Sequence, residues 1–256
     1  MHPDAVQYHS FSENRQVLVF PEVAGFIIDG RKKIYIERKP DASSALLALP
    51  FLGPVLAVWL NVRRKFTLHG SAVLHQGRAY GFVGDKGAGK STLASMLLKN
   101  PGVEFITDDL LVITESKYVL RGYPQMKLSD EALSHSNREL GHVRPPPIED
   151  FPKNQFRLDS QSSDEQVPVG CVFELRRSTE ARIEDLDLQS ALRVLLRFSY
   201  MSRYVDREMS STEKQDLFRT TTQLAASGRV KRLYVPERIE SLDEVINTFQ
   251  PLVEQY

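Results

Sequence analysis

The chain has 256 residues, of which 41% are hydrophobic, and this size and composition suit one main domain with a substantial core. Lysine plus arginine and aspartate plus glutamate each number 33, so no net charge attracts the protein to nucleic acid or to an anionic membrane. The single cysteine, Cys171, excludes an internal disulfide and a cysteine-based zinc cluster. We therefore expect a cytoplasmic protein with no nucleic-acid partner and no membrane partner.

Short β-prone runs open the chain, at 16–20, 26–28 and 33–37, with Asp29-Gly30 as a turn between the last two. They predict a small antiparallel β element within residues 1–44. The remainder, 45–256, is expected to form one compact unit.

The most apolar run, 45–60, lies in a predicted helix over 45–61. It is shorter than the ~18 residues that make a membrane-spanning helix plausible, and Pro50, Gly53 and Pro54 interrupt it. We interpret it as a core helix whose start is set by the prolines. The N-terminus has neither the basic start nor the apolar stretch of a secretory signal.

Strands and helices alternate through the rest of the chain, which indicates a mixed α/β fold. The predicted strands are 68–74, 78–83, 103–107, 110–115, 118–122, 169–175 and 232–235. The predicted helices are 92–99, 190–204, 212–227 and 242–256. Between them, residues 141–168 are rich in proline, serine, glutamine and charge, which predicts a long loop.

A glycine-rich segment directly follows the predicted strand 78–83 and precedes the helix 92–99. It matches the P-loop pattern G-x-x-x-x-G-K-[ST] at every fixed position and reads Gly84-Asp85-Lys86-Gly87-Ala88-Gly89-Lys90-Ser91, followed by Thr92. Its backbone N–H groups and the helix N-terminus would hold phosphate oxygens. Lys90 would neutralise the β- and γ-phosphates of ATP, and Ser91 would ligate Mg²⁺.

Asp108 and Asp109 follow the apolar strand 103–107, where carboxylates hold metal or act as bases in phosphoryl-transfer sites. Both are therefore candidate metal ligands with Ser91. We assign Asp108 as the base for an acceptor hydroxyl and Asp109 as structural or metal-linked, but the residues leave open which is which. A turn cap is the alternative role for one of them.

Further candidates carry positive charge or an imidazole. Lys127 could contact the transferred phosphoryl group, or it could be a solvated surface lysine. Arg193 and Arg197, like Arg203 and Arg207, are one helical turn apart and form either a basic edge for an acidic ligand or a solvated face. His69 taken alone is more often a satisfied surface or core histidine.

Leu68-His69-Gly70-Ser71, a hairpin, the P-loop and Thr107-Asp108-Asp109 follow one another in an order that resembles the catalytic domain of HPr kinase/phosphorylase and its smaller homologues. The resemblance is strong over about 65–128. It implies a P-loop kinase core of the type shared with phosphoenolpyruvate carboxykinase. It also places His69 near the γ-phosphate and favours a homo-oligomer.

The chain departs from the bifunctional bacterial enzyme, because it contains no N-terminal domain of comparable size and no Gly-Ile-Gly type segment after the aspartate pair. These differences argue against HPr as the substrate and against phosphorylase activity. The chain looks more like the compact kinases that act with ribosomal peptide tailoring, including lasso-peptide kinases that phosphorylate a serine of a precursor peptide.

The sequence therefore predicts an ATP- and Mg²⁺-dependent kinase that acts on a serine hydroxyl of a peptide or protein, with Asp108, His69, Lys90 and Lys127 as its catalytic set. One alternative is a small-molecule kinase whose acceptor is free serine or a sugar. A second is a regulatory module that binds ATP without transferring phosphate, and a third is a simple ATPase.

Overall fold

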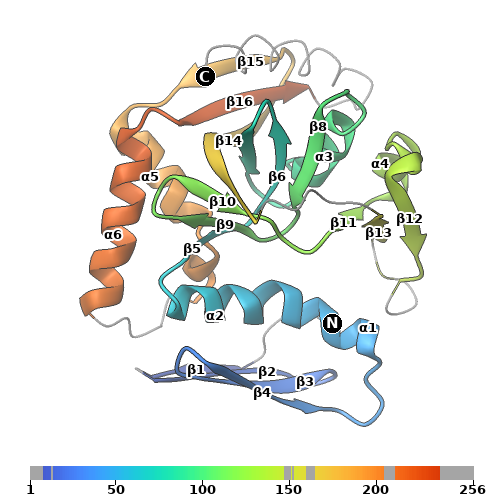
Figure 1. The fold of residues 1–256 in the computed structure, drawn as a ribbon, viewed down its shortest axis with the longest axis vertical. Helices are drawn as coiled ribbons and strands as arrows, with labels where there is room; N and C mark the ends of the chain where they lie inside the picture. Colours follow the sequence, from blue (N-terminus) through green and yellow to red (C-terminus); the bar gives the residue numbers. More distant parts are fainter. Residues whose placement is uncertain are drawn as a thin grey trace.

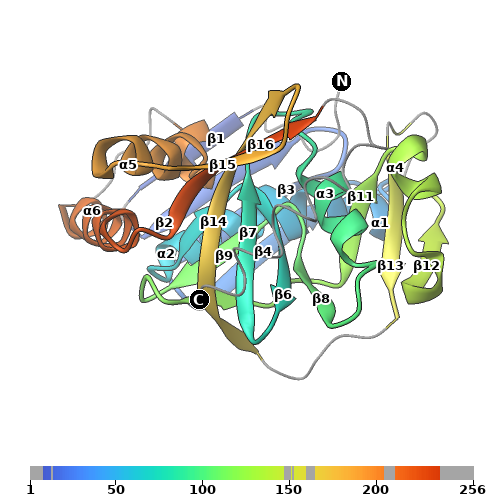
Figure 2. The same cartoon turned by 90° about the horizontal axis from the view of Figure 1, so that it is seen from above.

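The computed structural model describes residues 8–12, 14–146, 151, 153–159, 165–204 and 211–236. Over these residues the strands form three sheets with a few helices packed against them (Figures 1 and 2). This confirms the expected mixed α/β class. The predicted closing helix 242–256 lies outside the described residues.

The N-terminal sheet is an antiparallel meander in chain order. Its strands are β1 (Tyr8–Phe11), β2 (Arg15–Phe20), β3 (Ala24–Asp29) and β4 (Lys33–Arg38). The predicted β element is confirmed, with β1 as an addition. Buried and more exposed residues alternate along β2 and β3, so Leu18, Phe20 and Phe26 point to one apolar face.

A long helix runs between this sheet and the rest of the molecule (Figure 1). It comprises α1 (Ser44–Pro50), a π-helical turn η1 (Phe51–Val55) and α2 (Leu56–Val62). The Ser43 side chain caps its start by accepting from the backbone N of Leu46 at 3.1 Å. Pro50 and Pro54 lie inside the helix rather than at its start, because the wider π-turn accommodates residues that cannot donate a backbone hydrogen bond.

The 19 residues Ser44–Val62 contain an 18-residue window with a mean hydropathy of 2.0, so the helix is long and apolar enough to cross a membrane by length and composition alone. In the fold, however, the helix is packed on both sides. Val55 and Val58 pack against the N-terminal sheet, and Ala57 packs against the body of the protein. Because only 39% of the apolar window is buried, the expectation of a core helix holds in part.

The largest sheet has the strand order β5-β9-β10-β14-β7-β6-β8, with β16 pairing to both β14 and β15. The strands are β5 (Phe66–Leu68), β6 (Gly70–His75), β7 (Arg78–Val83), β8 (Val103–Thr107), β9 (Leu111–Thr114), β10 (Tyr118–Leu120), β14 (Gln166–Ser178), β15 (Arg182–Asp185) and β16 (Val230–Pro236). One part of this sheet contains β5, β9 and β10, and the other contains β6, β7, β8, β15 and β16. The long strand β14 joins the two parts, since it pairs antiparallel with β10 and parallel with β7 and β16. Figure 2 shows β14, β7, β6 and β8 side by side.

The predicted strand 68–74 is interrupted at His69. Residues before it pair with β9, whereas residues after it pair with β7 and β8. The chain thus passes from one part of the sheet to the other at His69, and the histidine lies at the break.

The predicted loop 141–168 was wrong in part, because two strands form within it. β12 (Gly141–Arg144) and β13 (Asn154–Leu158) pair with each other and with β11 (Gln125–Leu128) in a three-stranded sheet. The strands are short, and the surrounding prolines and serines dominate the composition from which the loop was predicted.

The helices outside the long one lie in two groups. α3 (Lys90–Leu97) and α4 (Asp130–Ser134) lie toward β11, while α5 (Leu188–Arg197) and α6 (Ser211–Ala226) lie at the opposite end (Figure 2). The predicted helix 190–204 ends earlier than expected and is followed by a 3₁₀ turn, η3 (Tyr200–Arg203). Cys171 is buried in the core, and burial raises the pKa of its thiol.

Substitution of Phe82 tests the hydrophobic core beneath the glycine-rich loop. It is fully buried on β7, and its ring stacks on Phe173 with centroids 6.0 Å apart. Phe82→Ala is expected to lower the free energy of unfolding by about 3–5 kcal/mol, because it leaves a cavity. Phe218 on α6 is 68% exposed, so Phe218→Ala should change that energy by no more than about 0.5 kcal/mol. Urea unfolding of both variants checks this, and equal losses would contradict the assignment of the core.

Candidate functional site

The glycine-rich loop 84–91 joins the end of β7 to the start of α3, as the motif requires. Gly87 and Gly89 have φ values of 86° and 93°, in the left-handed region that glycine adopts without strain. Gly89 immediately precedes the helix, so the loop curls over the α3 N-terminus, where unpaired backbone N–H groups favour anions.

Lys90 lies inside this curl. Its Nζ donates to the carbonyl oxygens of Gly84 at 3.0 Å and Asp85 at 3.2 Å, and the residue is only 8% exposed. The ammonium group is therefore positioned at the centre of the loop.

Asp108 connects the loop to the neighbouring strands. Its Oδ1 accepts from Ser71 Oγ at 2.6 Å and from Ser91 Oγ at 2.8 Å, and its Oδ2 accepts from the backbone N of Lys127 at 2.9 Å. Burial raises the pKa of this carboxyl, and the charge of Asp109 raises it further, against the lowering effect of the three hydrogen bonds.

Asp109 faces the same cleft as Asp108 because the backbone conformation changes after β8. Strand β8 ends at Thr107, and Asp109 has φ 66°, a left-handed conformation that aspartate tolerates better than most residues. Two successive strand residues would point to opposite faces, but here both carboxylates contact Lys127, one through its backbone and one through its side chain. Both carboxylates can face the cleft because the strand has ended before them.

Asp109 pairs with two cationic or ionisable partners. Its Oδ2 lies 2.7 Å from Lys127 Nζ, and its carbonyl oxygen lies 3.1 Å from His69 Nδ1. A carbonyl oxygen only accepts, so this contact requires the proton on Nδ1. Burial by itself would raise the pKa of Asp109, but Lys127 first and His69 second outweigh it and hold that pKa well below its usual range.

His69 is also fixed from the side of α5. Its backbone N donates to the carbonyl oxygen of Phe198 at 2.9 Å, and its ring meets the Tyr200 ring edge-on at 5.9 Å. The histidine therefore has a defined orientation between the aspartate pair and the turn after α5.

Two adjoining cavities meet at these residues. The first, the loop cavity, has about 370 Å³ and is lined by 86–93 of the glycine-rich loop and α3 together with Arg177. The second, the side cavity, has about 630 Å³ and extends past Asp85 and Arg197 toward Tyr200. Both are lined by His69, Lys86, Asp109, Lys127, Ser129 and Lys153. Together they form one cleft with a phosphate-type loop on one side.

The structure thus brings together every residue of the predicted site. Asp108, Asp109, Lys127 and His69 contact one another or the loop, and Thr92 lines the loop cavity with Lys90 and Ser91. Of the predicted arginine pairs, Arg197 reaches the site: its Nη2 lies 2.9 Å from both carboxylate oxygens of Asp85. Arg207 of the other pair lies outside the described residues.

Sequence reasoning missed Arg177 and Lys153. Arg177 Nη2 donates to the carbonyl oxygen of Gly87 at 3.3 Å, and its Nη1 donates to that of Pro236 at 2.8 Å. It comes from the end of β14, which is distant in sequence but parallel to β7. Lys153 precedes β13 and lines both cavities. No local motif marks either residue, and the strand pairing alone brings them to the cleft.

None of the protein-family models matches the chain, and no curated protein sequence matches it either.

Ser71 provides a test of the electrostatics at Asp108. Its hydrogen bond lowers the pKa of that carboxyl, so Ser71→Ala should raise it further above the ordinary value. The raised pKa means that folding favours the protonated form. The Ser71→Ala variant should therefore lose more stability at neutral pH than at acidic pH.

A pH titration of the Asp108 carboxyl carbon by NMR, with unfolding curves at both pH values, measures this effect. Ser95→Ala is the matched control, since Ser95 is equally buried but donates to the carbonyl oxygen of Thr92. A titration of Asp108 that is unchanged in Ser71→Ala would contradict the assigned contact.

Proposed function

We propose that the protein is an ATP- and Mg²⁺-dependent kinase that transfers the γ-phosphoryl group to a hydroxyl, with a serine of a peptide or protein as the first candidate acceptor. The supporting observation is the cleft, in which the glycine-rich loop and the Asp109 carboxylate line the same cavity. Asp109 is ion-paired with Lys127, and the neighbouring Asp108 is hydrogen-bonded to Ser91 of the loop. This arrangement offers phosphate binding on one side and an acceptor site on the other.

The residues present fit a magnesium ion. Mg²⁺ is usually held by one or two carboxylates, a hydroxyl and the substrate phosphates rather than by a complete protein cage. Ser91 Oγ and the Asp108 carboxylate are already in contact, and the described residues contain no group of three or more acidic, histidine or cysteine side chains that could hold a metal. Mg²⁺ bound there would neutralise charge on the phosphates of ATP.

The geometry favours an exchange of the two aspartate roles expected from the sequence. Asp108 is bound to Ser71, Ser91 and the Lys127 backbone, which suits a residue that holds the metal. Asp109 lines both the loop cavity and the side cavity, and Lys127 and His69 keep it ionised at neutral pH. We therefore propose Asp109 as the base and Asp108 as the metal-linked carboxylate.

In the proposed step, the acceptor hydroxyl oxygen forms a bond to the γ-phosphorus while the bond from that phosphorus to the bridging oxygen of ADP breaks. The bridging oxygen keeps the electron pair, and the hydroxyl proton passes to Asp109. Lys90 and Lys127 face the charge that develops on the transferred group, and His69 helps to hold the γ-phosphoryl group in line.

A small-molecule acceptor is the second candidate. The side cavity of about 630 Å³ is large enough for free serine or a sugar, and polar side chains line it beside Asp109. We further propose membership of the HPr kinase-like group and assembly as a homo-oligomer, both because of the sequence resemblance. A cytoplasmic location is proposed from the single cysteine, which fits a reducing compartment.

The first experiment follows transfer from labelled γ-phosphate ATP with Mg²⁺ to serine peptides, free serine, sugars and water. Transfer to an acceptor that is lost in Lys90→Ala supports the kinase. Binding of ATP without transfer to any acceptor would instead support a regulatory module, and release of phosphate to water alone would support an ATPase.

The two aspartates are distinguished by isosteric substitutions. Asp109→Asn should lower kcat by about 10²–10⁴-fold, as expected for loss of a general base, while ADP with Mg²⁺ still binds. Asp108→Asn should instead raise the Mg²⁺ concentration needed for half-maximal rate. Steady-state kinetics over a series of Mg²⁺ concentrations measures both effects. If Asp108→Asn lowers kcat and Asp109→Asn raises the Mg²⁺ requirement, Asp108 is the base, as expected from the sequence.

Substitution of Lys127 tests the role of Asp109 as the base through the pH dependence of kcat/KM. Lys127→Met removes the charge that contributes most to lowering the pKa of Asp109, so that pKa should rise. Because the base must be ionised, the acidic limb of kcat/KM should move to higher pH in the variant, in addition to any loss of rate. A lower rate with an unshifted acidic limb would argue against Asp109 as the base.

A further inference from the structure

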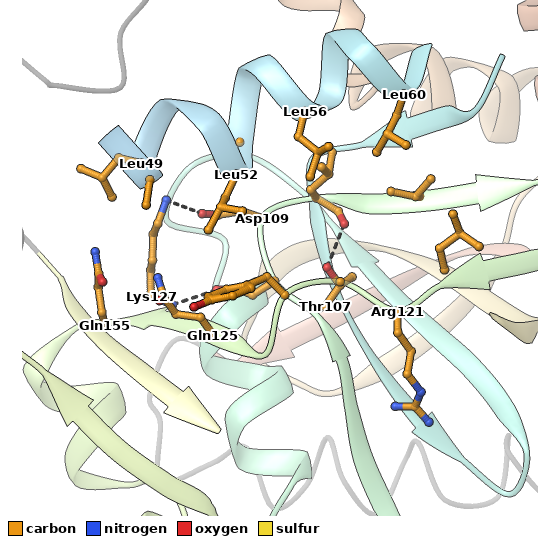
Figure 3. Close-up of a pocket in the computed structure, with 18 residues that line it drawn as sticks. Leu49, Leu52, Leu56, Leu60, Thr107, Asp109, Arg121, Gln125, Lys127 and Gln155 are labelled. Atoms are coloured by element: carbon orange, nitrogen blue, oxygen red, sulfur yellow. Dashed lines mark hydrogen bonds and ion pairs between the residues drawn. The ribbon is translucent and has the colours of Figure 1, made fainter. Parts of the chain in front are cut away.

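A third cavity lies beneath the long helix and is also lined by Asp109 and Lys127 (Figure 3). It has a volume of about 240 Å³. We call it the leucine cavity, because the helix lines it with Leu49, Leu52, Leu56 and Leu60. Val112 and Leu120 of the large sheet line it as well.

Different faces of the helix contact different parts of the protein. Val55 and Val58 are fully buried against the N-terminal sheet. The four leucines recur at intervals of three and four residues, so they follow one stripe on another face. Leu52, Leu56 and Leu60 are only partly buried, and Figure 3 shows their side chains directed toward the residues of the cavity. Apolar surface is thus left uncovered beside the cleft, and its burial by a ligand is favourable.

The cavity adjoins the site of the proposed transfer. Asp109 and Lys127 line the leucine cavity as well as the loop cavity and the side cavity. Gln125 and Gln155, which can both donate and accept hydrogen bonds, also line it. An acceptor hydroxyl at Asp109 would therefore lie beside the leucine cavity. The side-chain amides of Gln125 and Gln155 line that cavity together with the leucines.

We propose that the leucine cavity binds an apolar side chain of a peptide substrate, from the residue directly before or after the phosphorylated serine. This inference rests on the proposed kinase function and specifies its substrate class. Free serine and sugars have no apolar group that could fill the recess, whereas a peptide supplies an apolar side chain and, next to it, the backbone amides that glutamine side chains recognise.

The volume agrees with one large apolar side chain. An apolar protein cavity of about 150 Å³ accepts a benzene molecule. The leucine cavity, at about 240 Å³, has room for a leucine or phenylalanine side chain. A charged side chain would lose its hydration among the leucines, so the cavity selects against it.

The test uses two series of acetylated pentapeptide amides, Ala-Xaa-Ser-Ala-Ala and Ala-Ala-Ser-Xaa-Ala, in which Xaa is leucine, phenylalanine, alanine or glutamine. In one of the two series, leucine or phenylalanine should raise kcat/KM at least about tenfold over glutamine, given what burial of such a side chain contributes. Equal kcat/KM for all four peptides in both series would overturn the proposal. Transfer to free serine or a sugar with none to peptides would overturn it as well.

Variants connect this preference to the cavity. Leu52→Trp should fill the recess and abolish the preference for leucine and phenylalanine while it leaves ATP binding unchanged. Leu56→Phe, a smaller change, should weaken the preference in case the tryptophan disturbs the helix. Leu188→Trp is the control, because Leu188 is exposed on α5 and does not line the cavity. Retention of the preference in both Leu52→Trp and Leu56→Phe would refute the site.

A failure of the kinase function can be distinguished from a failure of the cavity. If no acceptor is phosphorylated, titration calorimetry with the same pentapeptides still measures whether the leucine peptide binds more tightly than the glutamine peptide. Tighter binding that Leu52→Trp removes would support the cavity as a peptide site without the reaction. Equal binding of both peptides would overturn it.

Discussion

The carboxylate of Asp108 joins three segments that are distant in sequence. Ser71 lies on β6, Ser91 lies in the first turn of α3, and Lys127 lies on β11, and each donates a hydrogen bond to this one side chain. A buried carboxylate is stabilised only when such donors satisfy it, so the three segments must keep this spacing. The position of the glycine-rich loop relative to the aspartate pair depends on that constraint, and so does the shape of the cleft.

The long helix Ser44–Val62 packs against two parts of the protein and also lines both the leucine cavity and the side cavity. Its composition would suit a membrane, yet it packs between the N-terminal sheet and the body (Figure 1). Pro50 and Pro54 remove backbone donors, and the π-turn at Phe51–Val55 changes which residues face each neighbour. A regular α-helix would present its leucines at a different angle to the cleft. Irregular helical turns of this kind often occur at functional sites.

Local patterns were sufficient to predict the glycine-rich loop, the strand before it, the helix after it and the hairpin that precedes it. These elements depend on residues close in sequence, so periodicity and turn residues define them. The break at His69, the strands within 141–168 and the arrival of Arg177 at the loop depend on pairing between distant strands. A single sequence carries little of that information. The roles of Asp108 and Asp109 were undecided for the same reason, because only the turn after β8 determines where each points.

The two neighbouring carboxyls now have opposite electrostatic environments. Burial and the adjacent charge raise the pKa of Asp108, whereas Lys127 and His69 lower that of Asp109. Pairs of titratable groups with pKa values shifted apart are a common means of dividing roles within one site. In the proposed kinase, the carboxyl with the raised pKa would gain most from a cation, and Ser91 Oγ, which donates to Asp108, would lie beside that cation. The carboxylate that stays ionised and lines the cavities would instead accept the proton of the acceptor hydroxyl. The chemistry of the pair therefore follows from its surroundings rather than from the identity of the residues, which is the same for both.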